Sequence, residues 1–277
     1  MIRHPNAKIN IGLHITEKRP DGFHNLESIF YPIGLSDILE IVTTPNKETA
    51  NSLQFSSSGI PIPGKGNLCE KAYVLLKTAF PDQMKGVSCL AHLHKLVPIG
   101  AGLGGGSSNA AFSLRMLNHL FNLRLDDSQL ENYAGQIGSD CPFFIRNKPV
   151  FAGGRGELFE PITLHLSNYY IKLVIPQIHV STPWAYSQII PKKSTFDLRT
   201  ISTLPINEWK NTLVNDFETA VFLKHPEIAL LKEELYREGA VYASMSGSGS
   251  AVFGLFTTPQ PSQAEKADCT VWTGRLS

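Results

Sequence analysis

The feature that most constrains the fold of this chain is a cluster of glycines one third of the way along it. Residues 100–106 read Gly-Ala-Gly-Leu-Gly-Gly-Gly, whereas average usage of about 7% would put about half a glycine there. An alternating stretch at 87–94 precedes the cluster, and apolar residues at helical spacing follow at 109–121. A strand, a glycine turn and a helix in this order bring free backbone N–H groups to a positive helix end, which favours phosphate binding. A flexible glycine linker is the competing interpretation.

The cluster partly matches a dinucleotide-binding loop. Gly100, Gly102 and Gly105 satisfy the GxGxxG pattern, but that pattern alone is weak. A dinucleotide fold also needs an acid about 20 residues further on, at the end of a parallel strand. Asp126 and Asp127 are near that distance but begin a predicted helix instead, so a dehydrogenase is the weakest of the functions considered.

Two other phosphate loops are excluded. A Walker loop needs lysine before its serine or threonine, and here Gly106 precedes Ser107. The protein-kinase triplets HRD and DFG are both absent. Ser107 and Ser108 remain able to cap the following helix or to contact phosphate and metal.

Composition limits the compartment and the partners. The 277 residues carry a formal net charge of +1, with 42% hydrophobic and 18% charged residues. This balance is typical of a globular chain, and no net basic field draws the protein to nucleic acid or to an anionic membrane. The four cysteines are far apart, and no stretch approaches the ~18 apolar residues of a spanning helix. We therefore expect a soluble cytoplasmic protein with no nucleic-acid or membrane partner; the sequence does not indicate an oligomeric state.

Strands and helices are expected in mixed groups along the chain. Ile9, Ile11, Leu13 and Ile15 alternate with Lys8, Asn10, Gly12 and His14, which predicts a strand with one buried face. Further strands are predicted at 29–33, 38–42, 53–55, 87–93, 171–175, 240–245 and 251–256, and helices from 67 onward, at 109–121, 127–137 and 226–238. The pattern favours an α+β fold over a parallel α/β sheet. A boundary between 150 and 160 divides the chain into residues 1–155 and 156–277.

Three segments together resemble the GHMP kinases, named for galactokinase, homoserine kinase, mevalonate kinase and phosphomevalonate kinase. They are residues 5–13, 98–108 and 246–250. The resemblance narrows within that family through residues 21–26, residues 137–144 and the pair Thr182-Pro183. These segments place the chain near the branch whose substrate is 4-diphosphocytidyl-2-C-methyl-D-erythritol, and the resemblance covers positions 5 to about 255, nearly the whole chain.

The resemblance implies a fold and a reaction. The expected fold has an N-terminal half similar to ribosomal S5 domain 2 and a ferredoxin-like C-terminal half, with the active cleft between them. The expected reaction is ATP-dependent phosphorylation of the 2-hydroxyl group of the cytidylyl substrate, a step of the non-mevalonate isoprenoid pathway. Mg²⁺ is expected to accompany ATP, and no other metal is expected.

The resemblance also implies two catalytic residues. Asp140 matches the catalytic acid of the family and is expected to accept the substrate proton. Lys8 matches the catalytic lysine and is expected to neutralise charge on the transferring phosphoryl group and to keep Asp140 ionised. Asn10 shares the strand face of Lys8 and is expected to bind substrate. Without the motifs, a solvated turn aspartate and a surface lysine would be the better interpretations.

The nucleotide contacts follow from the same matches. The triphosphate is expected to bind Pro98, Ile99, Gly100, Ala101, Gly102, Leu103, Gly104, Gly105, Gly106, Ser107 and Ser108. Asn67 and Leu68 resemble the adenine contacts, although Asn67 with Glu70 three residues later equally fits a helix-capping box. Thr182 matches a position near the nucleotide. The turn 246–250 either closes the cleft or is only a hairpin loop.

The pyrimidine site is assigned to Phe23, His24 and Tyr186. Phe23 and Tyr186 are expected to stack on the base while His24 hydrogen-bonds its polar edge. On pattern alone Phe23 fits a core residue better than a stacking residue. His92 and His94 are expected to face solvent, since two strand histidines without a third ligand do not make a metal site.

Two alternatives within this fold remain. Another small-molecule GHMP kinase would share the glycine loops without needing Phe23 and His24. A non-catalytic nucleotide-binding regulator would be expected to lack Lys8 or Asp140, and both are present. After Phe256 only 21 residues follow, which leaves the last expected helix and strand open.

Overall fold

The structure is a computed structural model that describes residues 1–44, 52–64, 66–261 and 268–276. Packing divides the chain into two compact units, each built from segments distant in sequence. Unit 1 comprises residues 1–7, 35–99 and 104–148, and unit 2 comprises residues 8–34, 100–103 and 149–277. The division between residues 1–155 and 156–277 stays a prediction about family domains, because the packing units are interleaved along the chain.

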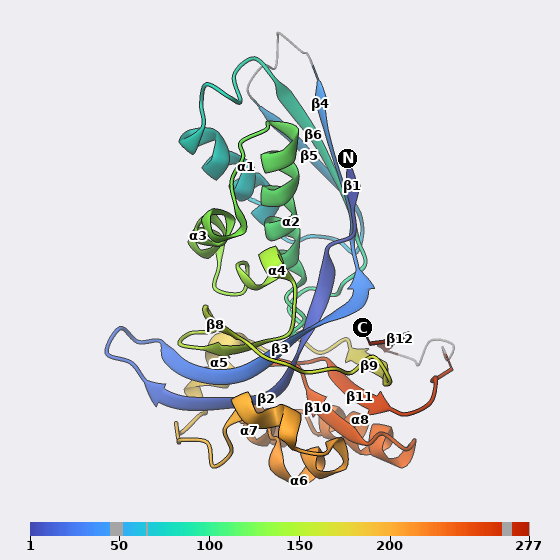
Figure 1. The fold of residues 1–277 in the computed structure, drawn as a ribbon. Coiled ribbons are helices and arrows are strands. Elements are labelled where there is room, and N and C mark those ends of the chain that lie inside the picture. Colours follow the sequence, from blue (N-terminus) through green and yellow to red (C-terminus); the bar gives the residue numbers. More distant parts are fainter. Residues whose placement is uncertain (45–51, 65, 262–267, 277) are drawn as a thin grey trace. The chain divides into compact units, whose positions relative to one another are not determined.

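Unit 1 contains a four-stranded sheet in the order β1-β4-β6-β5 (Figure 1). Its strands are β1 (Ile2–Arg3), β4 (Ile38–Thr44), β6 (Ser88–Lys95) and β5 (Leu53–Gly59). The pairs β1–β4 and β4–β6 are antiparallel, whereas β5 runs parallel to β6. The predicted alternation is confirmed from residue 89 onward, since Cys89, Ala91 and Leu93 are buried while Leu90 and His92 are exposed, but Ser88, expected on the open face, is buried.

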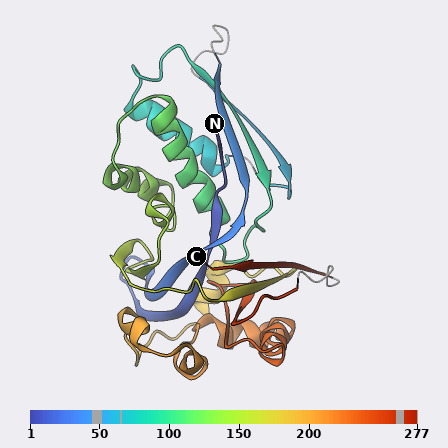
Figure 2. The ribbon, with the colours of Figure 1, turned by 45° about the vertical axis from the view of Figure 1, so that its right-hand side comes forward.

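Helices cover one face of this sheet (Figure 2). They are α1 (Leu68–Ala79), α2 (Gly105–Leu120), α3 (Asp127–Ile137) and the short α4 (Phe143–Arg146). Capping boxes fix the starts of two of them: Asn67 with Glu70 begins α1, and Asp126 with Gln129 begins α3. The predicted start of α2 was wrong, because the helix begins four residues earlier than residue 109 with Gly104 as its N-cap in the left-handed conformation. Ser107 and Ser108 therefore lie inside the first turn and do not cap it.

Unit 2 contains two further four-stranded sheets. The first has the order β2-β3-β7-β8 and consists of β2 (Asn6–Lys18), β3 (His24–Ser36), β7 (Val150–Gly153) and β8 (Leu158–Pro161). The prediction that β2 buries only one face was wrong, since residues 7–15 are all buried. Two loops distant in sequence contact the second face: Ser246 accepts a hydrogen bond from the Asn10 backbone, and Leu198 packs over Gly12.

The second sheet of unit 2 is antiparallel, with the order β10-β11-β9-β12. It consists of β9 (Tyr170–Pro176), β10 (Tyr242–Met245), β11 (Val252–Phe256) and β12 (Cys269–Arg275). The first strand, β9, lies between the third and the last, which is the order of a ferredoxin-like sheet and confirms that half of the predicted fold. The strand expected at the C-terminal end is β12, while residues 262–267 lie outside the described part of the chain.

Helices pack against the second sheet and form the core of unit 2. They are α5 (Thr182–Ser187), α6 (Trp209–Thr212), α7 (Phe217–Lys224) and α8 (Pro226–Arg237), with 3-10 turns at Leu198–Thr203 and Ile206–Glu208. Phe217, Val221, Ile228 and Leu235 are buried with side chains of the sheet in one apolar cluster. Each such side chain stabilises the fold by about 1.5–3 kcal/mol. Among the described helices, none has the length and apolar character needed to cross a membrane.

Candidate active site

The first turn of α2 is arranged to bind an anion. Helix geometry leaves the N–H groups of Gly105, Gly106 and Ser107 without a helical acceptor. In the described part of the chain no side chain caps this end, and the first turn contains no acidic residue. The positive end of the helix dipole and these free donors therefore favour phosphate.

A buried carboxylate stabilises this helix start through hydrogen bonds. Asp37, fully buried between β3 and β4, accepts hydrogen bonds from Lys95 Nζ at 2.6 Å and from Asn109 Nδ2 at 2.8 Å. It also accepts bonds from the backbone N–H groups of Leu96 at 2.7 Å and Val97 at 2.8 Å. One side chain thus fixes the end of β6, the start of the glycine segment and the second turn of α2.

The Lys95 ammonium group lies close to the start of α2. Burial lowers the pKa of Lys95, and the neighbouring Asp37 carboxylate opposes that change. A Cβ atom added to Gly105 would stand 3.0 Å from Lys95 Nζ and 2.9 Å from Val97 Cγ1. Glycine at 105 therefore lets the helix approach the ion pair closely.

Unit 1 also contains Asp140, whose neighbour Cys141 contacts the first turn of α2. Asp140 lies in the turn 139–142 that joins α3 to α4, as the predicted sharp connection requires. Burial raises the pKa of the adjacent Cys141 thiol to about 11, while a hydrogen bond with Ser107 acts in the opposite direction. Ser108 Oγ is buried and has no hydrogen-bond partner among the described residues. Two hydroxyl groups therefore lie in the first turn of α2, and Asp140 adjoins a thiol that contacts one of them.

The two residues expected to contact adenine lie at the start of α1. Asn67 Oδ1 accepts a hydrogen bond from the Cys69 backbone at 2.8 Å, and Glu70 accepts one from the Asn67 backbone at 2.9 Å. The capping role of Asn67 is thus confirmed, and its contact with a nucleotide stays a prediction. A Cβ atom on Gly106 would stand 3.6 Å from Leu68 Cδ1, so Leu68 borders the first turn of α2.

In unit 2 the segment 100–103 packs on the turn 246–250. Gly102 has a φ of +80°, and a Cβ atom there would stand 1.9 Å from the Ser246 carbonyl oxygen. The Ser246 hydroxyl donates to the Gly102 carbonyl at 2.9 Å, and the Ala251 backbone donates to that of Ala101 at 3.2 Å. The turn 246–250 is the hairpin loop between β10 and β11, and it also holds the glycine segment in place.

Lys8 and Asn10 form a buried polar pair beside this segment. The Lys8 backbone N–H donates to the Leu103 carbonyl at 3.0 Å, and its Nζ donates to Asn10 Oδ1 at 2.5 Å. The Asn10 amide donates to Ser28 Oγ at 2.9 Å. The two side chains are 4% and 2% exposed, and burying a lysine charge is costly unless it is paired. This burial contradicts the interpretation of Lys8 as a surface lysine, and its catalytic role stays a prediction.

The expected pyrimidine residues also lie in unit 2. The rings of His24 and Tyr186 stack with centroids 5.1 Å apart at 28°. Burial, with a smaller contribution from Lys18, lowers the pKa of His24. Phe23 is 55% exposed, with the Arg155 guanidinium 5.0 Å from its ring centroid. The core interpretation of Phe23 was wrong, and its stacking on a base stays a prediction.

Thr182 and the two residues before the glycines complete the predicted set. Thr182 Oγ1 lies 2.9 Å from Ser248 Oγ, which links the start of α5 to the 246–250 turn. Ile99 is 45% exposed and Pro98 is half-buried. Their contacts with a nucleotide stay predictions.

Residues near the site that sequence reasoning missed are Asp37, Lys95 and Asn109. Asp37 and Lys95 are 58 positions apart, and neither belongs to a motif that local patterns reveal. The available signal was a single acid between two apolar strands. Within the described ranges, no three His, Cys, Asp or Glu side chains group as metal ligands. His92 and His94 instead contact the hydroxyl groups of Ser56 and Ser58.

Comparison with known proteins agrees with this geometry. The family model "GHMP kinases N terminal domain" matches residues 67–148, and "GHMP kinases C terminal" matches residues 205–269. The chain is 49% identical over 281 residues to a 4-diphosphocytidyl-2-C-methyl-D-erythritol kinase of Parabacteroides distasonis and 50% identical over 285 residues to that of Bacteroides thetaiotaomicron, with 100% of both chains covered in each case.

Solved structures show the same similarity. A crystal structure of 4-(cytidine 5'-diphospho)-2C-methyl-D-erythritol kinase superimposes with a TM-score of 0.80 at 30% identity, covering 100% of this chain and 99% of that one. The Methanococcus jannaschii mevalonate kinase has a TM-score of 0.72 at 12% identity, covering 100% of this chain and 98% of that one. The second comparison concerns the fold alone.

Proposed function

Since the chain belongs to the GHMP kinase family and, within it, to the 4-diphosphocytidyl-2-C-methyl-D-erythritol kinases, we propose that it is an ATP-dependent kinase of that substrate. The group that it would phosphorylate is the 2-hydroxyl group. The products would be ADP and the 2-phosphate of the cytidylyl substrate, a step of the non-mevalonate route to isopentenyl diphosphate. The observation that carries the proposal is the uncapped start of α2, where free N–H groups follow Gly104.

The phosphates of ATP are assigned to backbone donors. The N–H groups of Gly105, Gly106 and Ser107 are fixed in direction by the helix and need no side-chain reorganisation when they bind. The buried Asp37 network supports the same turn. This assignment explains how a chain with a net charge of only +1 could bind two ligands that each carry several phosphate charges.

The transfer step needs a proton acceptor and charge neutralisation. The substrate 2-hydroxyl oxygen would attack the γ-phosphorus, the bond from that phosphorus to the β,γ-bridging oxygen would break, and ADP would leave with its electron pair. We assign the Asp140 carboxylate as the acceptor of the hydroxyl proton. Lys8 is assigned to the negative charge of the transferred group, and Asn10 holds its ammonium at 2.5 Å.

Mg²⁺ is proposed to accompany the nucleotide. Mg²⁺ prefers oxygen ligands and is bound in such sites by few protein groups together with substrate phosphates. Ser108 Oγ is a buried oxygen without a partner among the described residues, so the donor set fits, and Ser108 is the residue proposed to hold the ion. When bound, the ion would neutralise charge on the phosphate oxygens.

The substrate is tested by comparing three acceptors. The purified protein with ATP and Mg²⁺ is given the cytidylyl substrate, mevalonate or homoserine, and ADP release is followed together with the ³¹P NMR spectrum of the product. A new phosphomonoester signal is expected with the cytidylyl substrate alone. Turnover of mevalonate or homoserine without turnover of the cytidylyl substrate would assign the chain to another GHMP activity.

The compartment follows from the thiols. Cys69, Cys89 and Cys141 are buried free thiols. Unpaired thiols fit a reducing compartment, so we place the enzyme in the cytoplasm, which cell fractionation with an antibody against the chain would test.

A further inference from the structure

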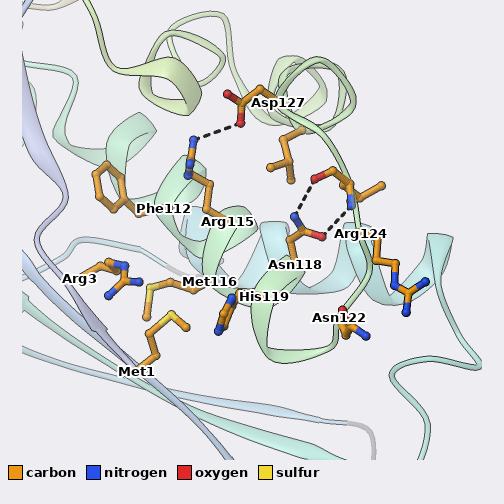
Figure 3. A pocket seen from close by; sticks show the side chains of 12 residues that line it. Met1, Arg3, Phe112, Arg115, Met116, Asn118, His119, Asn122, Arg124 and Asp127 are labelled. Atoms are coloured by element: carbon orange, nitrogen blue, oxygen red, sulfur yellow. Dashed lines mark hydrogen bonds and ion pairs between the residues drawn. The ribbon is translucent and has the colours of Figure 1, made fainter.

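A cavity in unit 1 has features of an anion site that the proposed kinase reaction does not use. Its volume is about 530 Å³, which lies within the range of small-molecule sites. Figure 3 shows that it is lined by the C-terminal half of α2, the connection from α2 to α3 and residues near β1. Ser107 and Ser108 lie at the opposite end of α2, and neither lines this cavity.

The charged side chains of the cavity are mostly positive. Arg3, Arg115 and Arg124 line it, and Asp127 is the one acidic residue in its lining. Asp127 lies 3.4 Å from Arg115, which also donates to the Ile145 carbonyl oxygen. Arg3 and Arg124 are exposed; Arg3 Nη1 donates to the Ile2 carbonyl oxygen at 3.0 Å, and in the described part of the chain Arg124 has no hydrogen bond or ion pair through its side chain. The Arg124 guanidinium and the other donors of Arg3 are therefore available to a ligand.

The backbone beside Arg124 is held in an unfavourable conformation. Asn122 has a φ of 49° and Arg124 a φ of 62°, a region that residues other than glycine seldom occupy. Asn118 fixes this connection, because its amide donates to the Leu125 carbonyl at 3.0 Å and accepts from the Leu125 N–H at 3.0 Å. Such conformations persist only where the surroundings impose them, and they cluster at ligand sites.

The rest of the lining is partly apolar. Phe112 and Met116 come from successive turns of α2, and Leu130 comes from α3. A guanidinium group binds phosphate through two parallel N–H donors, while an aromatic ring and a thioether contact an apolar body. The combination fits an organic molecule with one phosphate or diphosphate group better than it fits a bare inorganic ion.

We propose that this cavity binds a small organic phosphate, with Arg3 and Arg124 as its anion contacts and Phe112 and Met116 as its apolar wall. The proposal is independent of the kinase activity, since it concerns occupancy of this cavity and not turnover. A ligand bound there would contact the helix whose opposite end is assigned to ATP.

The test uses phenyl phosphate as the probe and calorimetry as the measurement. The full chain is first saturated with a non-hydrolysable ATP analogue and Mg²⁺, so that the probe does not report on the glycine segment. One-to-one binding with a Kd at or below about 1 mM is expected, together with binding of inorganic phosphate that is weaker by about tenfold or more. Binding of both probes with equal Kd would overturn the role of the apolar wall.

Three variants locate the site. The double variant Arg3→Gln/Arg124→Gln should weaken phenyl phosphate binding by about tenfold or more, since each lost guanidinium removes a charged hydrogen bond. Arg124→Gly should weaken it too while its Tm does not fall, because glycine accepts the positive φ. The matched control is Arg146→Gln, an exposed arginine of the same unit that pairs with Glu131 and does not line the cavity. An unchanged Kd in the double variant, or an equal loss in Arg146→Gln, would overturn the proposal.

Discussion

Replacing Asp37 by asparagine would test the ion pair that supports the start of α2. The carboxylate is fully buried and accepts four hydrogen bonds, from Lys95, Asn109 and the backbone N–H groups of Leu96 and Val97. Asparagine has nearly the same shape but offers one acceptor oxygen and an amide that can only donate. Lys95 would keep its buried position without the opposite charge.

The expected cost follows from that burial. Removing one partner of a buried ion pair costs about 3–5 kcal/mol, because the remaining charge is uncompensated. A neutral pair of similar volume is often close to the original stability. The double variant Asp37→Asn/Lys95→Met should therefore lose much less free energy of unfolding than the two single variants together.

The loss of free energy of unfolding in Asp37→Asn should also depend on pH. Burial already lowers the pKa of Lys95 below its ordinary value, and Asp37 opposes this, so asparagine at 37 should lower that pKa further. At pH values between the pKa of Lys95 in the folded chain and its pKa in the unfolded chain, the unfolded chain binds more protons. The free energy of unfolding therefore rises with pH in this range. The difference between Asp37→Asn and the unchanged protein should therefore shrink between pH 7 and pH 9.5.

Urea unfolding at both pH values measures these quantities, and the KM for ATP reports on the glycine segment. The KM should rise in Asp37→Asn, because an amide oxygen that still accepts from Leu96 and Val97 leaves the amide NH2 group facing Lys95 and Asn109, and Asn109 of α2 then loses its acceptor. A cost below about 1 kcal/mol at pH 7, or a cost that grows toward pH 9.5, would refute the reasoning, since a buried charge left unpaired cannot be so cheap.

Four further predictions concern the rest of the site. Asp140→Asn should lower kcat by about 10²–10⁴-fold while the Kd of an ATP analogue stays unchanged; a kcat near that of the unchanged protein would remove Asp140 from the role of base. Gly102→Ala should lower the free energy of unfolding and raise the KM for ATP more than Gly239→Ala does. Both glycines have a positive φ, but only the Cβ atom at position 102 would meet backbone, at 1.9 Å from the Ser246 carbonyl oxygen. Equal effects in urea unfolding would mean that the contact with Ser246 is unimportant. Burial raises the pKa of Cys69 to about 12 and those of Cys89 and Cys141 to about 11. A disulfide reagent at pH 8 should therefore label the half-buried Cys269 first. Rapid labelling of Cys141 would contradict its burial. Phe23→Ala should raise the KM for the cytidylyl substrate and leave that for ATP unchanged, and an unchanged KM for both would end the stacking proposal.

Local patterns predicted local structure well. The capping box of Asn67 and Glu70 was visible because its two partners are three residues apart. The start of α2 could not be read in the same way, because Gly104 begins the helix through its left-handed φ of 69° and not through a side chain. Glycine runs permit several such starts, and the packing against Val97 and Lys95 selects one.

Long-range burial was the main part that the sequence did not reveal. Alternation along residues 8–15 predicted one exposed face, but loops around residues 198 and 246 cover it. The alternation placed Lys8 and Asn10 on the same strand face, and their side chains do bond to each other, while their enclosure depends partly on segments more than 180 residues away. The same reason explains why Asp37 was missed, since its partners lie 58 to 72 positions further along.

The interleaving of the two units has a consequence for the order of events during synthesis. Unit 1 is complete once residue 148 has emerged, whereas the strand β2 of unit 2 is made almost first and is covered by the turn 246–250, made almost last. At about 5–20 residues per second, β2 waits roughly 10–50 s for that partner. During this time its apolar residues and its buried lysine have only early segments to contact, so a ribosome-bound chain stalled before residue 246 should expose β2 to chaperones and proteases while unit 1 is already protected.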